Sequence, residues 1–166
     1  MQTQVPWSQN DELFKKELSK GIYYAGKVVE YLAKKGINCE YDNNLDFRKS
    51  IKESYKYKDQ VDASYKGRIL EIKSRREKFI TPLDFPYDTI MIETVRGYDQ
   101  KSIKPYAYIN ISQITGAIIC LPGYKNDDWI VSRHFDRTRK IHDTWYETEK
   151  TKWYTIDELI QVMLAW

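Results

Sequence analysis

Hydrophobic and polar residues alternate along two short runs in the middle of the chain, Gln60–Tyr65 and Arg68–Lys73. Alternation of this kind is typical of half-buried β-strands. Only Lys66 and Gly67 separate the two runs, and a two-residue linker that contains glycine favours a tight turn. The pattern therefore predicts a β-hairpin.

The register of this hairpin places two carboxylates opposite each other. Counting outward from the turn pairs Tyr65 with Arg68 and, three steps further, Asp62 with Glu71. The Cβ atoms of such a pair are about 5 Å apart. Lys73 shares their face because strand side chains alternate. Facing carboxylates repel each other unless a cation lies between them, and hard divalent cations such as Mg²⁺ bind carboxylate oxygens.

Apolar residues at helical spacing predict a helix over Asp11–Lys35, with a break or kink near Lys20 and Gly21 and an end at Gly36. Ile37–Tyr41 is expected to form a first strand. Later strands are expected over Asp88–Val95, Tyr106–Ser112, Ala117–Leu121 and Trp129–Ser132, with a turn or short helix over Arg96–Lys104.

Near the C-terminus, Thr155 and Glu158 have the spacing of a capping box and are followed by an amphipathic helix. A helix, a largely antiparallel sheet and a closing helix make an α+β layout. We therefore expect residues 1–166 to form a single α+β domain, in which helices flank a mixed, largely antiparallel central sheet.

Composition agrees with a folded domain outside membranes. Charged residues make up 31% of the 166 residues, and no apolar run approaches membrane-spanning length. Met1–Trp7 lacks the layout of an export signal, so a cytoplasmic location is expected. The net charge of +3 permits nucleic-acid binding without requiring it.

Asp62, followed after eight residues by Glu71, Ile72 and Lys73, resembles the PD-(D/E)xK nuclease superfamily, which has the restriction-endonuclease-like fold. The resemblance implies DNA as the partner and hydrolysis of its phosphodiester bonds. It implies that Asp62 and Glu71 bind Mg²⁺, for which Mn²⁺ substitutes, and that the Ile72 carbonyl is a further ligand. Lys73 would orient or deprotonate the attacking water; a purely electrostatic role is equally permitted.

The superfamily often adds a carboxylate from the first helix. The expected position falls near Ala25, which cannot bind metal, and the acidic residues nearby are Glu17 and Glu30. Glu30 has Lys27 and Lys34 at helical spacing, so surface ion pairs also explain it. Glu17 is the favoured candidate.

Phosphate contacts are expected from a basic segment after the hairpin and from one polar residue near the sheet, although a solvated surface explains these residues about as well. The candidates are Arg75, Arg76, Lys78 and Gln113. Specificity would lie in two segments rich in charges and rings, Asp42–Asp59 and Asp127–Trp153; the second carries Arg133, Arg137, Arg139 and Lys140.

Three functions fit the sequence. The first is an Mg²⁺-dependent endonuclease of phage or mobile-element type, with a nuclease selective for branched DNA as a subclass and a homodimer as a compatible state. The second is a nucleic-acid-binding module that has the same fold but no catalytic activity. The third is a structural or interaction protein in which Asp62 and Glu71 line a solvated hairpin.

Overall fold

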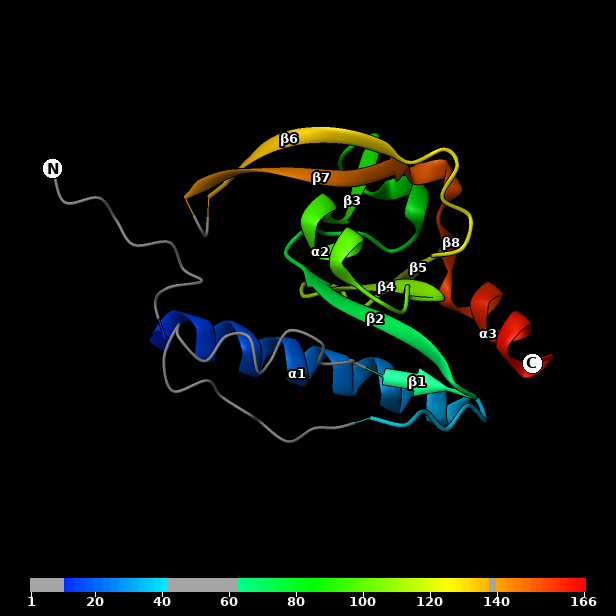
Figure 1. The fold of residues 1–166 in the computed structure, drawn as a ribbon. Coiled ribbons are helices and arrows are strands. Elements are labelled where there is room, and N and C mark those ends of the chain that lie inside the picture. The colour runs from blue at the N-terminus through cyan, green and yellow to red at the C-terminus, as the bar shows by residue number, and fades with distance from the viewer. Residues whose placement is uncertain (1–10, 42–62, 138–139) are drawn as a thin grey trace, which may run out of the picture.

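The computed structural model describes residues 11–41, 63–137 and 140–166 (Figure 1). The helices in these ranges are α1 (Asp11–Lys34), α2 (Val95–Gln100) and α3 (Ile156–Leu164), with the 3-10 turns η3 (Pro82–Asp84) and η4 (Lys150–Lys152). The strands are β1 (Ala63–Tyr65), β2 (Arg68–Arg75), β3 (Thr89–Thr94), β4 (Ala107–Ser112), β5 (Ile118–Pro122), β6 (Ile130–Asp136), β7 (Ile141–Glu149) and β8 (Tyr154–Thr155).

The strands form two sheets, and the predicted α+β class is confirmed. The larger sheet has the order β1-β2-β4-β5-β8, and the smaller one has the order β3-β7-β6. All pairs are antiparallel except β2 with β4, which run parallel. Parallel neighbours need a long crossover between them. Here the crossover contains η3, β3 and α2, which places these elements against one face of the larger sheet.

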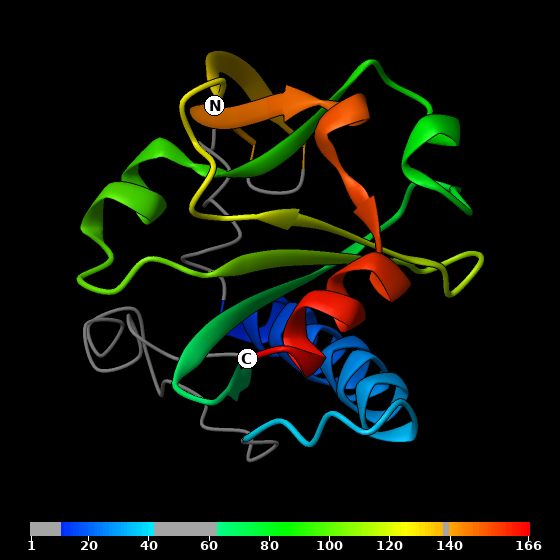
Figure 2. The same ribbon diagram turned by 90° about the vertical axis from the view of Figure 1, so that its right-hand side faces the viewer.

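Helices α1 and α3 cover the other face of the larger sheet, which we call the helix face (Figure 2). The buried residues of this side include Ala25, Val28, Leu32, Leu70, Ile72, Ile109, Ile111, Cys120, Ile160 and Met163. The crossover and the smaller sheet lie against the opposite face, which we call the crossover face. The buried residues of that side include Phe79, Phe85, Ile90, Ile92, Tyr98, Tyr108, Ile119, Leu121 and Trp153.

Helix α1 ends where the glycine signal predicts. Gly36 has a φ of 89°, its amide donates to the Ala33 carbonyl, and the Ile37 amide donates to the Leu32 carbonyl. These two bonds make a Schellman motif, with Ile37 and Leu32 as its apolar pair. Of the break or kink expected near Lys20 and Gly21, the break is wrong, because the helix is continuous through both positions. Burial of one side of α1 against the sheet outweighs the low helix propensity of glycine.

The expected strand over Ile37–Tyr41 is also wrong. Ile37 is fully buried as part of the cap of α1, and the residues that follow make a single bridge, between Glu40 and Ser64. The apolar character of Ile37, which indicated a strand, is therefore explained by its role in the cap of α1.

The C-terminal half agrees in part with expectation. The predicted antiparallel pair is confirmed as β4 and β5, and Thr155 accepts a hydrogen bond from the Glu158 amide as the N-cap of α3. Strand β6 is longer than the expected Trp129–Ser132. Strand β7 has no counterpart among the expected strands. Together, β6 and β7 form a two-stranded ribbon that extends beyond β3 (Figure 1).

Candidate functional site

The hairpin that carries the motif has the predicted register. Its pairs are Tyr65 with Arg68, Ser64 with Ile69 and Ala63 with Leu70. Lys66 and Gly67, which form the turn, have φ values of 49° and 75°. Two positive φ values are what a type I′ turn requires. Asp62 lies outside the described residues, so its place opposite Glu71 stays a prediction.

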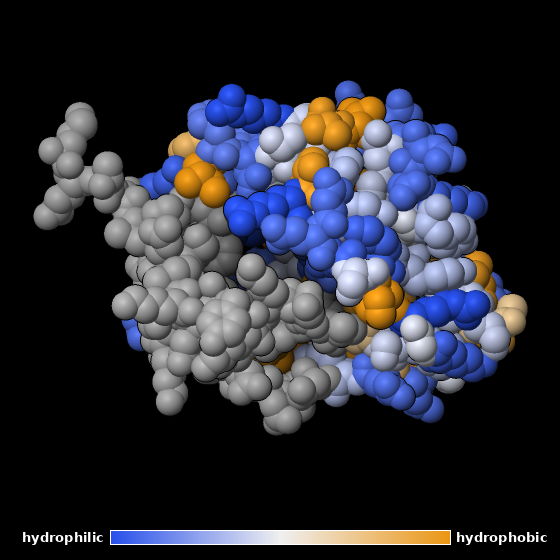
Figure 3. All heavy atoms as spheres, viewed as in Figure 1, coloured by the Kyte–Doolittle hydropathy of each residue, from blue (hydrophilic) through white to orange (hydrophobic). Residues whose placement is uncertain are grey.

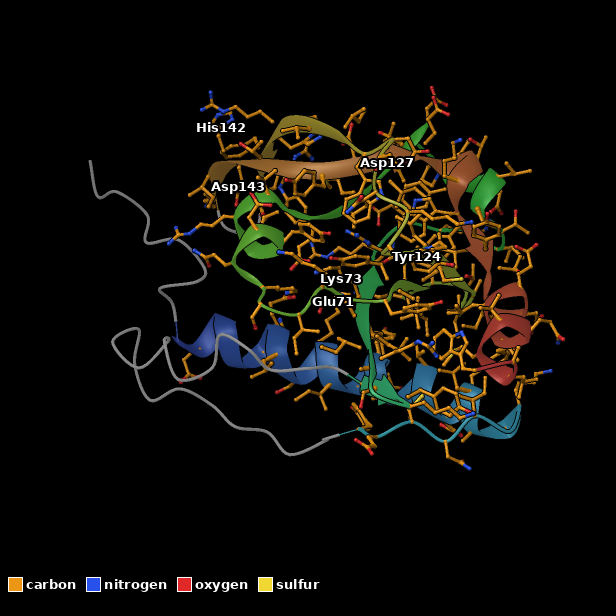
Figure 4. The ribbon with its side chains drawn as sticks, turned by 45° about the vertical axis from the view of Figure 1, so that its right-hand side comes forward. Glu71, Lys73, Tyr124, Asp127, His142 and Asp143 are labelled. Atoms are coloured by element: carbon orange, nitrogen blue, oxygen red, sulfur yellow. The ribbon has the colours of Figure 1, made fainter. Side chains whose placement is uncertain are left out.

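Glu71 and Lys73 lie together on the crossover face of β2 (Figure 4). Lys73 Nζ is 3.4 Å from Glu71 Oε1. Leu70 and Ile72 point the other way and are buried on the helix face. The side chains of Glu71 and Lys73 are 15% and 27% exposed, so water reaches both only in part.

Two residues that the sequence did not single out as site residues complete this group. Lys101 follows α2, and its Nζ lies 2.8 Å from Glu93 Oε1 and 3.9 Å from Glu71 Oε2. Glu93 lies near the end of β3, where a β-bulge between Met91 and Glu93 interrupts the pairing with β7. Bulges re-aim the side chains next to them. We call Glu71, Lys73, Glu93 and Lys101 the charged cluster.

Tyr108 fixes the orientation of Glu93. Its hydroxyl donates to Glu93 Oε2 over 2.7 Å, and its ring is buried next to Glu71 in the parallel ladder of β2 and β4. Burial raises the pKa of the Tyr108 phenol, and the negative charge of Glu93 raises it further. The phenol therefore stays protonated and keeps donating to Glu93.

Asn110 adds a polar group with unused hydrogen-bonding capacity. It is the register partner of Lys73 in β4 and is 1% exposed. Within the part of the chain that the structure describes, neither its Oδ1 nor its Nδ2 has a hydrogen-bond partner. Register partners in parallel strands point to the same face, so this carboxamide faces the same side as Lys73. A buried polar group without a partner is uncommon and costs stability, so it indicates a place for something else to bind.

The sequence contained one signal for Glu93. An acidic residue directly after the apolar run Ile90–Ile92 interrupts a strand that is otherwise buried. A charge in such a place needs a partner. The partner, Lys101, carried no signal, because it reaches the cluster only through the crossover.

The helix carboxylates lie apart from the charged cluster. Glu30 makes an exposed ion pair of 3.4 Å with Lys34, one turn further along α1. Glu17 faces Arg76 beyond the end of β2, with 3.9 Å between Glu17 Oε1 and Arg76 Nη2. In these ion pairs, the partners of the two helix carboxylates are Lys34 and Arg76, which lie outside the charged cluster.

The candidate phosphate contacts have different environments. The Arg75 guanidinium donates to the Met91 carbonyl, and burial lowers the pKa of Arg75 while Glu77 raises it. Gln113 Nε2 donates to Ser74 Oγ over 3.0 Å. Lys78 is exposed. Arg75 and Gln113 therefore hold the end of β2 in place, whereas Lys78 is open to solvent.

The oxygen donors of the site suit a hard cation. Glu71 and Glu93 supply carboxylates and Asn110 supplies a carboxamide oxygen, the ligand types that Mg²⁺ prefers. Among the residues that the structure describes, no three His, Cys, Asp or Glu side chains gather closely enough to hold a metal by themselves. That set does not include Asp62.

Comparisons of the chain with family models, with curated proteins and with solved structures give no match. Within the described ranges, none of the helices combines the length and apolar character needed to cross a lipid bilayer. The geometry of the charged cluster is therefore what points to a function.

Proposed function

We propose that this protein is an Mg²⁺-dependent endonuclease that hydrolyses phosphodiester bonds in DNA. The observation that carries the proposal is the pairing of Glu71 with Lys73 on the crossover face of β2, beside the buried carboxylate of Glu93. A strand that presents an acid and an amine together, next to a second acid, can hold a cation and a phosphate at once.

Each residue has a distinct part in the proposed reaction. A bound Mg²⁺ supplies Lewis acidity and activates water. Glu71, with Asp62 as its proposed partner, holds the cation. The Lys73 ammonium donates hydrogen bonds to the attacking water or to the phosphate and offsets negative charge as it develops. Tyr108 keeps Glu93 in one orientation, which pre-organises the site.

The ribbon of β6 and β7 supports nucleic acid as the partner. Arg133, Arg137 and Lys140 are exposed on it, and the rings of Phe135 and His142 lie in contact, tilted by 57° with centroids 5.1 Å apart. A two-stranded ribbon fits the major groove of duplex DNA, and cationic side chains bind phosphates. His142 and Asp143 lie on opposite sides of the ribbon (Figure 4).

On the face seen in Figure 3, hydrophobic side chains appear as separate patches among hydrophilic ones.

Two of the regions expected to determine specificity lie outside the described residues. They are the segment Asp42–Asp59 and Arg139. His134 is part of the ribbon, and its Nε2 lies 2.9 Å from Glu147 Oε2 and 2.8 Å from Ser132 Oγ. This environment is that of a structural contact within the sheet.

A plasmid assay tests the proposal. Supercoiled plasmid and single-stranded circles are incubated with the protein in Mg²⁺, Mn²⁺ or a chelator. We expect nicking with either metal and none with the chelator. Lys73→Met should lower the rate about a thousandfold, the range for loss of a positioned acid or base, and Glu71→Gln should abolish nicking. Glu149→Gln and Lys152→Met are the matched controls, because both residues are exposed and lie outside the charged cluster.

The alternatives have different outcomes in this assay. Cleavage that persists in chelator contradicts the metal mechanism. Salt-dependent DNA binding without cleavage favours a binding module that has lost catalysis, for which the engagement of Glu17 by Arg76 is the supporting observation. Neither binding nor cleavage favours the structural role.

A further inference from the structure

Within the charged cluster, Lys101 joins the two sheets. Its ammonium touches Glu71 on β2 of the larger sheet and Glu93 on β3 of the smaller one. Glu71 Oε2 and Glu93 Oε1 therefore lie no farther apart than the sum of their distances to Lys101 Nζ. Glu93 is only 6% exposed, so its charge has little water to stabilise it. A cation between these two carboxylates is what the fold requires.

The Lys101 ammonium lies between Glu71 and Glu93, in the place that a cation bound by both carboxylates would have to occupy. A divalent cation there would repel the ammonium groups beside it, so its binding favours the departure of one lysine. Lys73 lies within β2, whereas Lys101 follows the last residue of α2 and precedes the exposed Ser102 and Ile103. The two side chains are similarly exposed, at 27% for Lys73 and 25% for Lys101, so the difference between them is that Lys101 lies outside the strands and between the two carboxylates.

Two further groups fit the same place. Tyr108 binds Glu93 Oε2, so the oxygen that faces Lys101 is Oε1. Asn110, buried and without a partner in the described structure, faces this side of the sheet with a carboxamide oxygen. A cation, or water bound to it, would satisfy that oxygen, to which the ammonium of Lys101 does not donate in the described structure.

We propose that Glu93 is a cation ligand together with Glu71, and that Lys101 holds the cation's place in the resting protein and leaves when the cation binds. This inference rests on the proposed function for the identity of the cation, but it concerns binding and not cleavage. In the resting state, Lys101 prevents repulsion between Glu71 and Glu93. When the cation binds, Lys101 turns outward, where its charge becomes available to a phosphate.

Mn²⁺ binding without DNA tests this proposal. We measure it by titration calorimetry and by the electron paramagnetic resonance signal of free Mn²⁺. Lys101→Met should bind Mn²⁺ about tenfold tighter than the unaltered protein, a change of 1.4 kcal/mol, because no ammonium competes. Glu93→Gln should bind it about tenfold or more weakly. Lys152→Met, at an exposed lysine that pairs with Asp128 and not with the cluster, should leave binding unchanged.

Lysine acetylation read by mass spectrometry supplies a second measurement on the unaltered protein, which does not depend on whether a variant folds. Mn²⁺ should increase the acetylation of Lys101 several-fold and leave that of Lys152 unchanged. Protection of Lys101 by Mn²⁺, equal or weaker Mn²⁺ binding by Lys101→Met, or no Mn²⁺ binding at all would each overturn the inference.

The two proposals fail separately. Release of Lys101 by Mn²⁺ without nicking of any DNA leaves the inference standing and removes the nuclease. Metal-dependent nicking that is lost in Glu71→Gln, combined with Mn²⁺ binding that is insensitive to Lys101 and Glu93, leaves the nuclease standing and removes the inference.

Discussion

The two faces of the larger sheet differ sharply, although the same strands supply both. On β4, Ile109 and Ile111 point to the helix face and belong to its hydrophobic cluster, whereas Tyr108 and Asn110 point to the crossover face. The crossover face has an apolar part, around Ile119 and Leu121, and a polar part, which holds the charged cluster. The helix face therefore supplies stability, and this allows the other face to bury polar groups at a cost.

The largest effect is expected on the helix face. Ile109→Ala removes a fully buried side chain between the sheet and the helices and should lower the free energy of unfolding by about 2–5 kcal/mol. Urea denaturation measures the change. Ile103→Ala is the matched control, because Ile103 is 66% exposed, and it should change stability by less than about 0.5 kcal/mol. An Ile109→Ala loss as small as that of the control would show that the helix face is not the stabilising one.

A substitution at the neighbouring residue, Asn110, should change the free energy of unfolding in the opposite direction. Asn110→Leu replaces an unpartnered buried carboxamide by an apolar group of similar volume, so it should raise the free energy of unfolding by about 1 kcal/mol. Asn38→Leu, at an exposed position, serves as the control. A loss of stability in Asn110→Leu would mean that the carboxamide is satisfied in solution.

The smallest effect on stability is expected at Asp84, in the turn between Phe79 and Phe85, which are both buried on the crossover face. The amides of Thr81 and Ile80 donate to the Asp84 carboxylate and lower its pKa. A carboxyl whose pKa is lower in the folded state stabilises above its unfolded pKa, about 3.9, and loses this contribution as the pH falls through the folded value.

Asp84→Asn should therefore be less stable than the unaltered protein at pH 7, and the difference should shrink as the pH falls below about 4. Thermal unfolding at pH 7 and pH 3 measures it, with the exposed Asp127→Asn as the control. A difference that is constant across this range would show that the Asp84 charge has no part in holding the turn.

The sequence predicted those features whose causes are local. The hairpin register followed from a two-residue turn at Lys66 and Gly67, and the end of α1 followed from Gly36. Thr155 indicated the start of α3. In each case the deciding residues are neighbours in the chain, so their spacing carries the information.

The sequence failed where distant segments meet. Glu93 and Lys101 lie near Glu71 only because β2 and β4 pair in parallel and the crossover returns along one face. Strand β7 was missed because Ile141–Glu149 mixes polar and aromatic residues, and its pairing with β3 and β6 decides its conformation. Ile37 was assigned to a strand because helix capping and strand formation favour the same apolar side chain.

The parallel pairing of β2 and β4 also governs the order in which the molecule can assemble. Hairpins such as β1–β2 close in about 1–10 μs, because their strands adjoin in sequence. The parallel pair must await synthesis and folding of the whole crossover, and contacts of long sequence separation form slowly. Glu71 and Lys73 therefore share one strand of a local hairpin, whereas Glu93 and Lys101 reach them only through the crossover. Any activity that depends on all four groups begins only when the domain is complete.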